Sequence, residues 1–295
     1  LASGVFRHGQ SELSQEAKVH YLKDGKTATI SVFTQGSMAT ISTNGKPDAS
    51  LTMSSQEVAT SDEITMLMAA SLPLGIHPNP KSVAVIGWGS GLTTHTLLGS
   101  HVPTVVDSIE IEKAMHDGAR LFGDRVSRAY DDPRSILHID DARTYFSTGR
   151  KQYDVIISEP SNPWVSGVSA LFTHQFYRFL SGHLNDEGIL IQWLQSYELS
   201  DDLLATMLVA LQQEFPYIDV YLTNSSDLLF VSSRSPLPAL DMRKLADPAL
   251  AAELARVGLA GEGDYLVRRL GSQDLLKGLA ALSGAQAHSD FLPVV

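Results

Sequence analysis

Short alternations of apolar and polar positions fill the first part of the chain. They cover residues 19–22, 28–33 and 38–42, with turn signals at Asp24-Gly25 and Asn44-Gly45. A period of two residues is typical of strands with one buried face, and a glycine after Asp or Asn favours a hairpin turn. We therefore predict a small N-terminal β domain of strands and hairpins over residues 1–60.

The pattern changes near residue 61. A helix is expected from Ser61, which can cap its first turn, to Leu74. Apolar runs then alternate with helical patterns. They predict strands over residues 83–86, 104–109, 135–139, 153–158 and 188–194, a helix over 200–213, and an antiparallel edge pair over 218–222 and 228–231. Such alternation predicts right-handed crossovers between parallel strands.

A glycine-rich turn follows the first parallel strand. From Gly87 to Gly91 the chain reads Gly-Trp-Gly-Ser-Gly, and Leu92 comes next. Glycines allow a sharp turn and a close approach of a ligand. The dinucleotide fingerprint needs a small residue where Leu92 stands, and a P-loop needs a Lys-Ser/Thr pair that does not follow this turn. The turn therefore favours S-adenosylmethionine or a relative over NAD, FAD or a nucleoside triphosphate.

Two acidic residues follow the next two strands. Glu110 comes about 20 residues after the turn, where an acid can accept both hydroxyls of a ribose. Asp141 follows the third strand and can take the adenine amino group. The candidate cofactor-binding residues are Gly87, Gly89, Ser90, Gly91, Glu110, Asp141 and Ala142.

These patterns together predict an α/β fold with a mostly parallel, Rossmann-like sheet of the S-adenosylmethionine-methyltransferase-like kind, beside the small N-terminal β domain. The nucleoside-binding α/β domain is expected over residues 61–235. Residues 236–295 are expected to form a C-terminal helical extension, because residues 237–282 look helical and are rich in leucine and alanine.

Composition narrows the function further. The 295 residues carry a net charge of −11, whereas a nucleic-acid-binding surface shows a basic excess, so no nucleic-acid partner is expected. The absence of cysteine excludes disulfides and thiolate metal sites, and no His-Glu-x-x-His motif occurs, so no metal is expected. No apolar run reaches the length of about 18 residues that a membrane-spanning helix needs. The first residue is not Met, which suggests a piece of a longer protein.

A stiff polar loop follows the fourth strand. From Ser158 to Trp164 it reads Ser-Glu-Pro-Ser-Asn-Pro-Trp. Ligands of open α/β sheets lie outside the carboxyl ends of the strands, so this loop is expected to face the reactive end of the cofactor. Pro163 favours an extended backbone at Asn162, which leaves its amide free.

Several motifs together resemble the spermidine synthase family over residues 18–233. They are Asn44-Gly45-Lys46, Leu72-Pro73-Leu74, the turn at 87–91, Ile109-Glu110-Ile111-Glu112, Asp132-Pro133-Arg134, Asp141-Ala142-Arg143, Tyr153-Asp154-Val155-Ile156-Ile157 and Leu171-Phe172-Thr173-x-x-Phe176-Tyr177. The chain resembles most the branch in which such a domain is fused to membrane-spanning segments, because that branch also reads Ser-Glu-Pro-Ser-Asn-Pro-Trp. The stretch from Asp290 to Pro293 is similar to that branch's closing motif.

The resemblance implies an aminopropyltransferase. Family members move an aminopropyl group from decarboxylated S-adenosylmethionine to putrescine and release methylthioadenosine. By motif, the resemblance implies that Glu110 holds the ribose and Asp141 the adenine, while Gly87 and Gly89 line the turn.

The chain departs from the family pattern where the cationic groups are held. The family Asp within the turn is Ser90 here, and the Asp-x-x-Asp pair after the fourth strand is replaced by Glu159 and Asn162. Asn162 accepts a hydrogen bond but takes no proton at neutral pH, so Glu159 would serve as acid or base. Glu159 and Asn162 are the candidate catalytic residues. The candidate substrate contacts are Asp48, Trp164 and Tyr177.

Three functions stay open at this point. The first is an aminopropyltransferase-like transferase that uses decarboxylated S-adenosylmethionine and a small amine, such as a polyamine. The second is an S-adenosylmethionine-dependent methyltransferase, favoured by the neutral Ser90 and a likeness of Asn162-Pro163-Trp164 to the Asn-Pro-Pro-aromatic signature. The third is a non-catalytic domain that binds a nucleoside or polyamine and regulates a membrane partner. We expect a cytoplasmic location, and a homodimer and membrane segments outside this chain are compatible with the resemblance.

Overall fold

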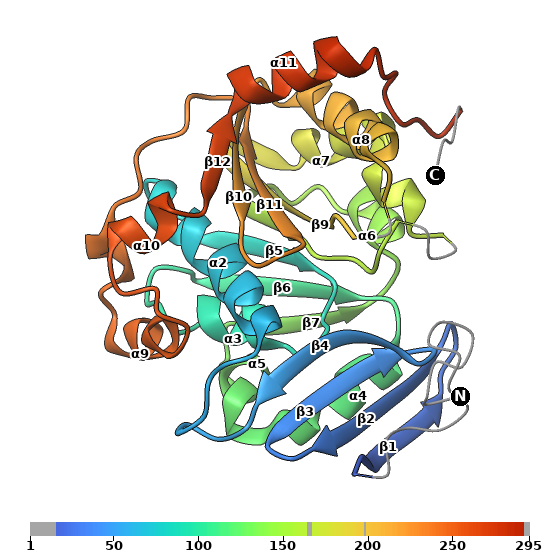
Figure 1. Cartoon of the computed structure of the whole chain (residues 1–295), viewed down its shortest axis with the longest axis vertical. Coiled ribbons are helices and arrows are strands. Elements are labelled where there is room, and N and C mark those ends of the chain that lie inside the picture. The colour runs from blue at the N-terminus through green and yellow to red at the C-terminus, as the bar shows by residue number, and fades with distance from the viewer. Residues whose placement is uncertain (1–15, 164–166, 198, 292–295) are drawn as a thin grey trace.

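The computed structural model describes residues 16–163, 167–197 and 199–291 (Figure 1). Its N-terminal part is an antiparallel four-stranded sheet in the order β1-β2-β3-β4. The strands are β1 (Lys18–Asp24), β2 (Thr29–Gln35), β3 (Met38–Thr43) and β4 (Lys46–Thr52). The turn between β3 and β4 places Asn44 at φ 50° and Gly45 at φ 80°, as the Asn-Gly signal predicts. The small N-terminal β sheet predicted from the alternation is therefore confirmed.

The larger sheet has eight strands in the order β12-β10-β11-β9-β8-β5-β6-β7. Its strands are β5 (Ser82–Ile86), β6 (Val105–Glu110), β7 (Ser135–Ile139), β8 (Tyr153–Ser158), β9 (Leu184–Gln195), β10 (Tyr217–Leu222), β11 (Asp227–Ser233) and β12 (Arg269–Ser272). Strands β5 to β9 run parallel, and β10 to β12 are antiparallel to their neighbours. This arrangement confirms the mostly parallel, Rossmann-like sheet.

Helices cover both faces of this sheet. They are α2 (Ser61–Ile76), α3 (Leu92–Leu97), α4 (Lys113–Ala119), η1 (Arg120–Val126), α5 (Ser127–Asp131), α6 (Ala142–Thr148), η2 (Ser169–Phe172), α7 (His174–Gly182), α8 (Asp201–Glu214), η3 (Met242–Leu245), α9 (Pro248–Arg256), α10 (Glu262–Leu266) and α11 (Gln273–Ser283). Among the described residues, none of these helices combines the length and apolar character needed to cross a membrane.

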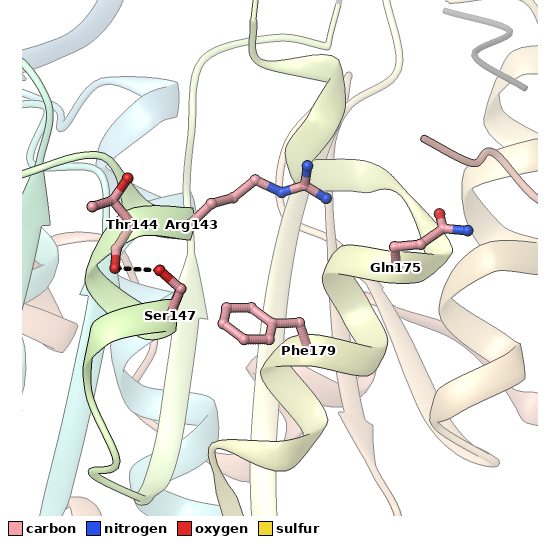
Figure 2. A pocket seen from close by; sticks show the side chains of 5 residues that line it. All are labelled: Arg143, Thr144, Ser147, Gln175 and Phe179. Carbon is pink, nitrogen blue, oxygen red and sulfur yellow. Dashed lines mark hydrogen bonds between the residues drawn. The ribbon is translucent and has the colours of Figure 1, made fainter. Parts of the chain in front are cut away.

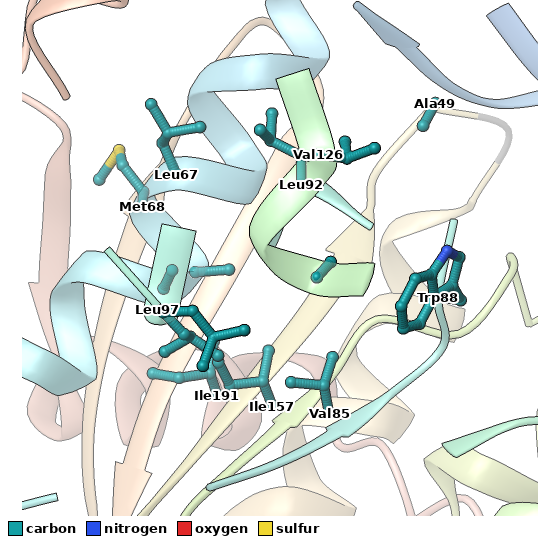
Figure 3. Packing of buried hydrophobic residues seen from close by; sticks show 14 of the residues in the cluster. Ala49, Leu67, Met68, Val85, Trp88, Leu92, Leu97, Val126, Ile157 and Ile191 are labelled. Carbon is teal, nitrogen blue, oxygen red and sulfur yellow. The ribbon is translucent and has the colours of Figure 1, made fainter. Parts of the chain in front are cut away.

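The buried apolar side chains form two clusters, and successive residues along a strand belong alternately to one cluster and the other. On β5, Val83 and Val85 belong to the cluster under α2 and α3, whereas Ala84 and Ile86 belong to the cluster under α6, α7 and α8. Figure 3 shows labelled members of the first cluster, among them Leu67 of α2 and Ile157 and Ile191 of the strands. Full burial of such a side chain stabilises the fold by about 2 kcal/mol. These two layers fix the carboxyl ends of the strands, and with them the loops that follow.

Several boundaries differ from the sequence expectations. Thr60 caps α2 rather than Ser61, and the Glu63 carboxylate accepts from the Thr60 amide at 3.2 Å. The pair β10 and β11 does not form the sheet edge, because β11 pairs with β9 and β10 pairs with β12. Strand β12 comes from the C-terminal extension, so the prediction of a helical segment there was incomplete. Its four residues include Gly271 and carry no β-branched side chain, which left no strand signal in the sequence.

Candidate active site

The turn between β5 and α3 depends on backbone conformations that glycine favours. Gly87, Gly89 and Gly91 have φ values of 95°, 52° and 84°. L-residues with a side chain rarely adopt this region. The Gly87 amide donates to the Ile109 carbonyl oxygen at 2.9 Å, which ties the turn to β6. Ser90 is completely buried; its hydroxyl accepts from the Leu92 amide at 3.3 Å.

Replacing Gly87 with Ala tests this turn. A Cβ at Gly87 would collide with the Glu159 carbonyl oxygen, whereas a Cβ at Gly89 would meet no atom within 4 Å. We expect Gly87→Ala to lower the free energy of unfolding by about 3 kcal/mol and Gly89→Ala by about 1 kcal/mol. Urea unfolding of both variants measures the difference, and equal losses would contradict the close packing at Gly87.

Glu110 ends β6 with a nearly buried carboxylate that is 7% exposed. One oxygen accepts from the Trp88 amide at 2.9 Å and the other from the Glu112 amide at 2.8 Å. Burial raises the pKa of Glu110 to about 7, and the charges of Asp48 and Glu112 also raise it. The two hydrogen bonds from the Glu112 and Trp88 amides lower this pKa and so offset part of the rise. The carboxylate is held rigidly beside the turn, and each oxygen keeps a second lone pair for a ligand hydroxyl.

Asp141 lies at the end of the neighbouring strand. Glu110 pairs with Ile139 in the β6–β7 ladder, and the Asp140 amide donates to the Glu110 carbonyl oxygen at 3.1 Å. Asp141 caps α6, and its Oδ1 accepts from the Thr144 amide at 2.9 Å. Ala142, the first residue of α6, is buried. The structure thus brings Glu110 and Asp141 to adjacent strand ends, at the edge where the glycine turn also lies.

The loop after β8 carries Glu159 next to the same turn. The Glu159 amide donates to the Ile86 carbonyl oxygen at 2.9 Å. Burial raises the pKa of Glu159 to about 7; the Thr93 hydroxyl opposes this rise, and the charge of Asp227 adds to it. A carboxyl with such a pKa can exchange a proton near neutral pH.

Asn162 is completely buried in this loop. Its Nδ2 donates to Gln195 Oε1 at 2.8 Å, which joins the loop to the end of β9. Its Oδ1 has no hydrogen-bond partner among the described residues. A buried carbonyl oxygen without a partner is costly unless a ligand supplies the donor. Trp164, the predicted substrate contact in this loop, lies outside the described residues.

The sequence reasoning missed Asp227. It opens β11 and pairs with Gln195 in the ladder with β9. Because β11 is antiparallel to β9, its first residue lies at the carboxyl end of the parallel strands. The carboxylate is 6% exposed; Oδ2 accepts from Thr65 and Asn224, and Oδ1 has no partner among the described residues. Burial raises the pKa of Asp227, while its hydrogen bonds and the charge of Lys46 oppose that rise.

Asp48 approaches the same loop from β4 of the N-terminal sheet. Its Oδ1 accepts from the Ser161 hydroxyl at 3.1 Å and lies 3.6 Å from Lys46 Nζ. Its Oδ2 is buried without a hydrogen-bond partner in the described part of the chain. The predicted Asp48 contact therefore lies beside the loop that holds Glu159. Its partner Lys46 stands in the Asn44-Gly45-Lys46 motif, although the sequence reasoning gave that lysine no role.

Tyr177, the third predicted substrate contact, lies on α7. Its side chain is 1% exposed and belongs to the cluster under α6, α7 and α8. Burial raises its pKa. The role of Tyr177 as a substrate contact, which its motif position implies, stays a prediction.

A shallow groove of about 410 Å³ lies between α6 and α7 (Figure 2). Arg143, Thr144, Ser147, Gln175 and Phe179 line it. These residues lie along α6 and α7, and Arg143 and Thr144 directly follow Asp141 and Ala142 in the chain. No cluster of three or more His, Cys, Asp or Glu residues suited to a metal ion occurs within the residues that the structure describes.

Comparisons with known proteins identify the family and the fold of this chain. A polyamine aminopropyltransferase of Leptospira biflexa serovar Patoc is 31% identical over 156 residues, which cover 53% of this chain and 55% of that protein. The chain thus spans about half the length of the curated relatives it matches. A crystal structure of a spermidine synthase in complex with the transition-state analogue AdoDATO aligns with a TM-score of 0.69 at 20% identity, covering 90% of this chain and 89% of that one.

A more distant structure supports the same fold. Human methyltransferase-like protein 13 in complex with SAH aligns with a TM-score of 0.50 at 23% identity, over 66% of this chain and 93% of that one. The spermine/spermidine synthase domain matches residues 63–227, which run from the first turn of α2 to the first residue of β11. The chain therefore belongs to the spermine/spermidine synthase domain family.

Proposed function

We propose that this chain is a transferase that binds decarboxylated S-adenosylmethionine and moves its aminopropyl group to an amine. The observation that carries the proposal is the position of Glu159. Its carboxyl has a pKa raised to about 7 by burial and by the charge of Asp227, and its backbone carbonyl packs against Gly87 of the turn. The second Asp of the family's Asp-x-x-Asp pair is Asn162 here, but Glu159 at the first position can still accept a proton.

The nucleoside would lie over the glycine turn. In this proposal Glu110 accepts from the ribose hydroxyls and Asp141 from the adenine amino group. Two supports are the adjacent ends of β6 and β7 and the free lone pairs of Glu110. The related spermidine synthase that binds AdoDATO and the methyltransferase that binds SAH both hold an adenosyl compound on this fold.

The chemical step is a nucleophilic displacement. The acceptor nitrogen forms a bond to the aminopropyl carbon next to the sulfonium sulfur. The carbon–sulfur bond breaks, its electron pair stays on sulfur, and neutral methylthioadenosine leaves. Glu159 takes the proton that the acceptor ammonium loses before its nitrogen attacks. Asn162 Oδ1 and Asp227 Oδ1, which lack partners in the described residues, would accept from the same amine and orient it.

Methyl transfer from S-adenosylmethionine is the second candidate, and Ser90 favours it. A decarboxylated cofactor carries an ammonium at the end of its aminopropyl group. Ser90 is a neutral residue at a turn position where the family has a carboxylate, and its hydroxyl contacts Met66 Sδ at 3.3 Å. The amino-acid end of S-adenosylmethionine carries both an ammonium and a carboxylate, so its net charge is zero. A neutral turn residue suits such a group because no carboxylate is needed to balance a lone ammonium.

A product assay separates the two candidates. The protein is incubated with either cofactor and with putrescine, spermidine or a monoamine, and the released nucleoside is separated by chromatography. We expect methylthioadenosine from decarboxylated S-adenosylmethionine only when an amine is present. Release of S-adenosylhomocysteine from S-adenosylmethionine would establish the methyltransferase instead. Binding of either nucleoside without any product would leave a domain that only binds.

A further inference from the structure

The side chain of Glu112 is a second buried carboxylate beside Glu110. Glu112 is 4% exposed and stands at the start of α4, where its Oε1 accepts from the Ala114 amide at 3.0 Å. Its own backbone amide donates to Glu110 Oε1 at 2.8 Å. Hydrogen bonds therefore join Glu112 both to the first turn of α4 and to the carboxylate of Glu110.

The other carboxylate oxygen of Glu112 holds the hairpin turn between β1 and β2. Oε2 accepts from the Thr27 amide at 2.8 Å and from the Thr27 hydroxyl at 3.0 Å. A Cβ on Gly25 would collide with this carboxylate, so the turn packs directly on it. Figure 1 shows α4 lying against the N-terminal sheet that carries the turn. The N-terminal sheet thus reaches the end of β6 through the side chain of Glu112.

A carboxylate at this position has an electrostatic cost. Burial raises the pKa of Glu112, but hydrogen bonds from Ala114, Thr27 and Ala28 outweigh burial and lower it, so the group is charged at neutral pH. Its charge raises the pKa of the neighbouring Glu110. Shorter side chains such as Ser or Asp also cap a helix start, so capping α4 does not by itself require Glu at this position. The longer side chain adds the contact with Thr27.

We propose that Glu112 is a positioning residue for Glu110, and that through it the Thr27 turn of the N-terminal sheet strengthens the binding of a ribose. A group that must accept two ribose hydroxyls has to be held within about 0.5 Å of its productive position. Glu112 supplies the amide that orients Glu110 Oε1, and its own side chain is anchored on two sides. This inference rests on the nucleoside binding in the proposed function, but it does not need the transfer step.

Two nucleosides that differ only in the ribose hydroxyls test the proposal. Methylthioadenosine and its 2′,3′-dideoxy analogue are titrated into the full chain at pH 8, above the pKa of about 7 of Glu110. Nuclear magnetic resonance gives the dissociation constants, because it also detects weak binding. Glu112→Ala should weaken methylthioadenosine binding about tenfold and binding of the dideoxy analogue less than about twofold. Thr27→Val keeps the charge of Glu112 and loses only the hydroxyl donor, so it should weaken methylthioadenosine binding about threefold.

The controls separate a positioning role from a general loss of structure. Removing the charge of Glu112 favours the ionised form of Glu110, so weaker ribose binding in Glu112→Ala cannot come from the charge. Asp241→Ala removes the side-chain cap of a different helix, η3, and should leave both affinities unchanged.

Two results would overturn the inference while the nucleoside site stands. They are equal weakening of both nucleosides in Glu112→Ala, which indicates general loosening, and unchanged affinities in both variants, which indicate that Glu110 needs no support. If the wild-type protein binds neither nucleoside, the proposed function fails and the inference fails with it. Thr27→Val is sufficient for the decision if Glu112→Ala folds poorly, because the hydroxyl-specific loss is expected there too.

Discussion

Replacing Glu159 with Gln is expected to lower the rate of aminopropyl transfer by about 10² to 10⁴-fold, the usual contribution of a general base. The amide keeps the size of the side chain and its contact with Thr93, but it cannot take the proton of the acceptor ammonium. Methylthioadenosine release measures the rate, and binding of the same nucleoside should change less than threefold. Glu262→Gln, an exposed residue of α10, is the matched control. A variant as fast as the wild type would remove Glu159 from the mechanism.

The pH profile gives a second readout for the same residue. A base acts only when it has lost its proton, so a pKa of about 7 predicts a rate that rises from pH 6 and levels above pH 8. Asp227→Asn removes a negative charge that raises the pKa of Glu159. The midpoint of the profile should therefore shift to lower pH in that variant, while the control Glu262→Gln keeps the wild-type midpoint. An unchanged midpoint in Asp227→Asn would show that another group controls the profile.

The sequence was sufficient where one residue type determines the local structure. The turn at Gly87 needs positive φ, and the branched apolar runs before and after it form buried strands with nearly the predicted bounds. Glu110 and Asp141 could be located because Glu110 ends β6 and Asp141 follows β7 after one residue. The carboxyl ends of parallel strands share one edge of a sheet, so chain order alone placed these two acids near each other.

The residues on the side of the site proposed to bind the acceptor amine could not be predicted in the same way. Asp227, Asp48 and Lys46 come from an antiparallel strand and from the separate N-terminal sheet, so their approach depends on how distant segments pack. The sequence showed that Ser90 and Asn162 stand where the family has carboxylates. The structure places another carboxylate, that of Asp227, beside Thr65 of α2. For Tyr177, which lies in the cluster under α6, α7 and α8, a motif match alone does not distinguish a ligand contact from a core residue.

Replacing Glu110 with Ala is expected to abolish nucleoside binding. In the proposed complex its carboxylate accepts two ribose hydroxyls, and hydrogen bonds to a charged group contribute about 1.5–3 kcal/mol each. Loss of both weakens binding by at least about 100-fold, which calorimetry with methylthioadenosine detects as the absence of heat at micromolar nucleoside. An affinity within a factor of three of the wild type would place the ribose elsewhere.

The free energy of unfolding of Glu110→Ala should also depend less on pH than that of the wild type. This difference tests whether the Glu110 carboxyl is buried in the folded protein. Burial, with the charges of Asp48 and Glu112, raises the pKa of Glu110 from 4.5 to about 7 in the folded protein. A raised pKa means that the folded state holds the proton more tightly than the unfolded state does. The contribution of Glu110 to the free energy of unfolding is therefore complete below pH 4.5 and is lost as pH rises through 7. The loss corresponds to about 3 kcal/mol. Urea unfolding at pH 5 and pH 8 should therefore show a smaller decline for the variant than for the wild type, and equal declines would mean that Glu110 titrates as an exposed carboxyl.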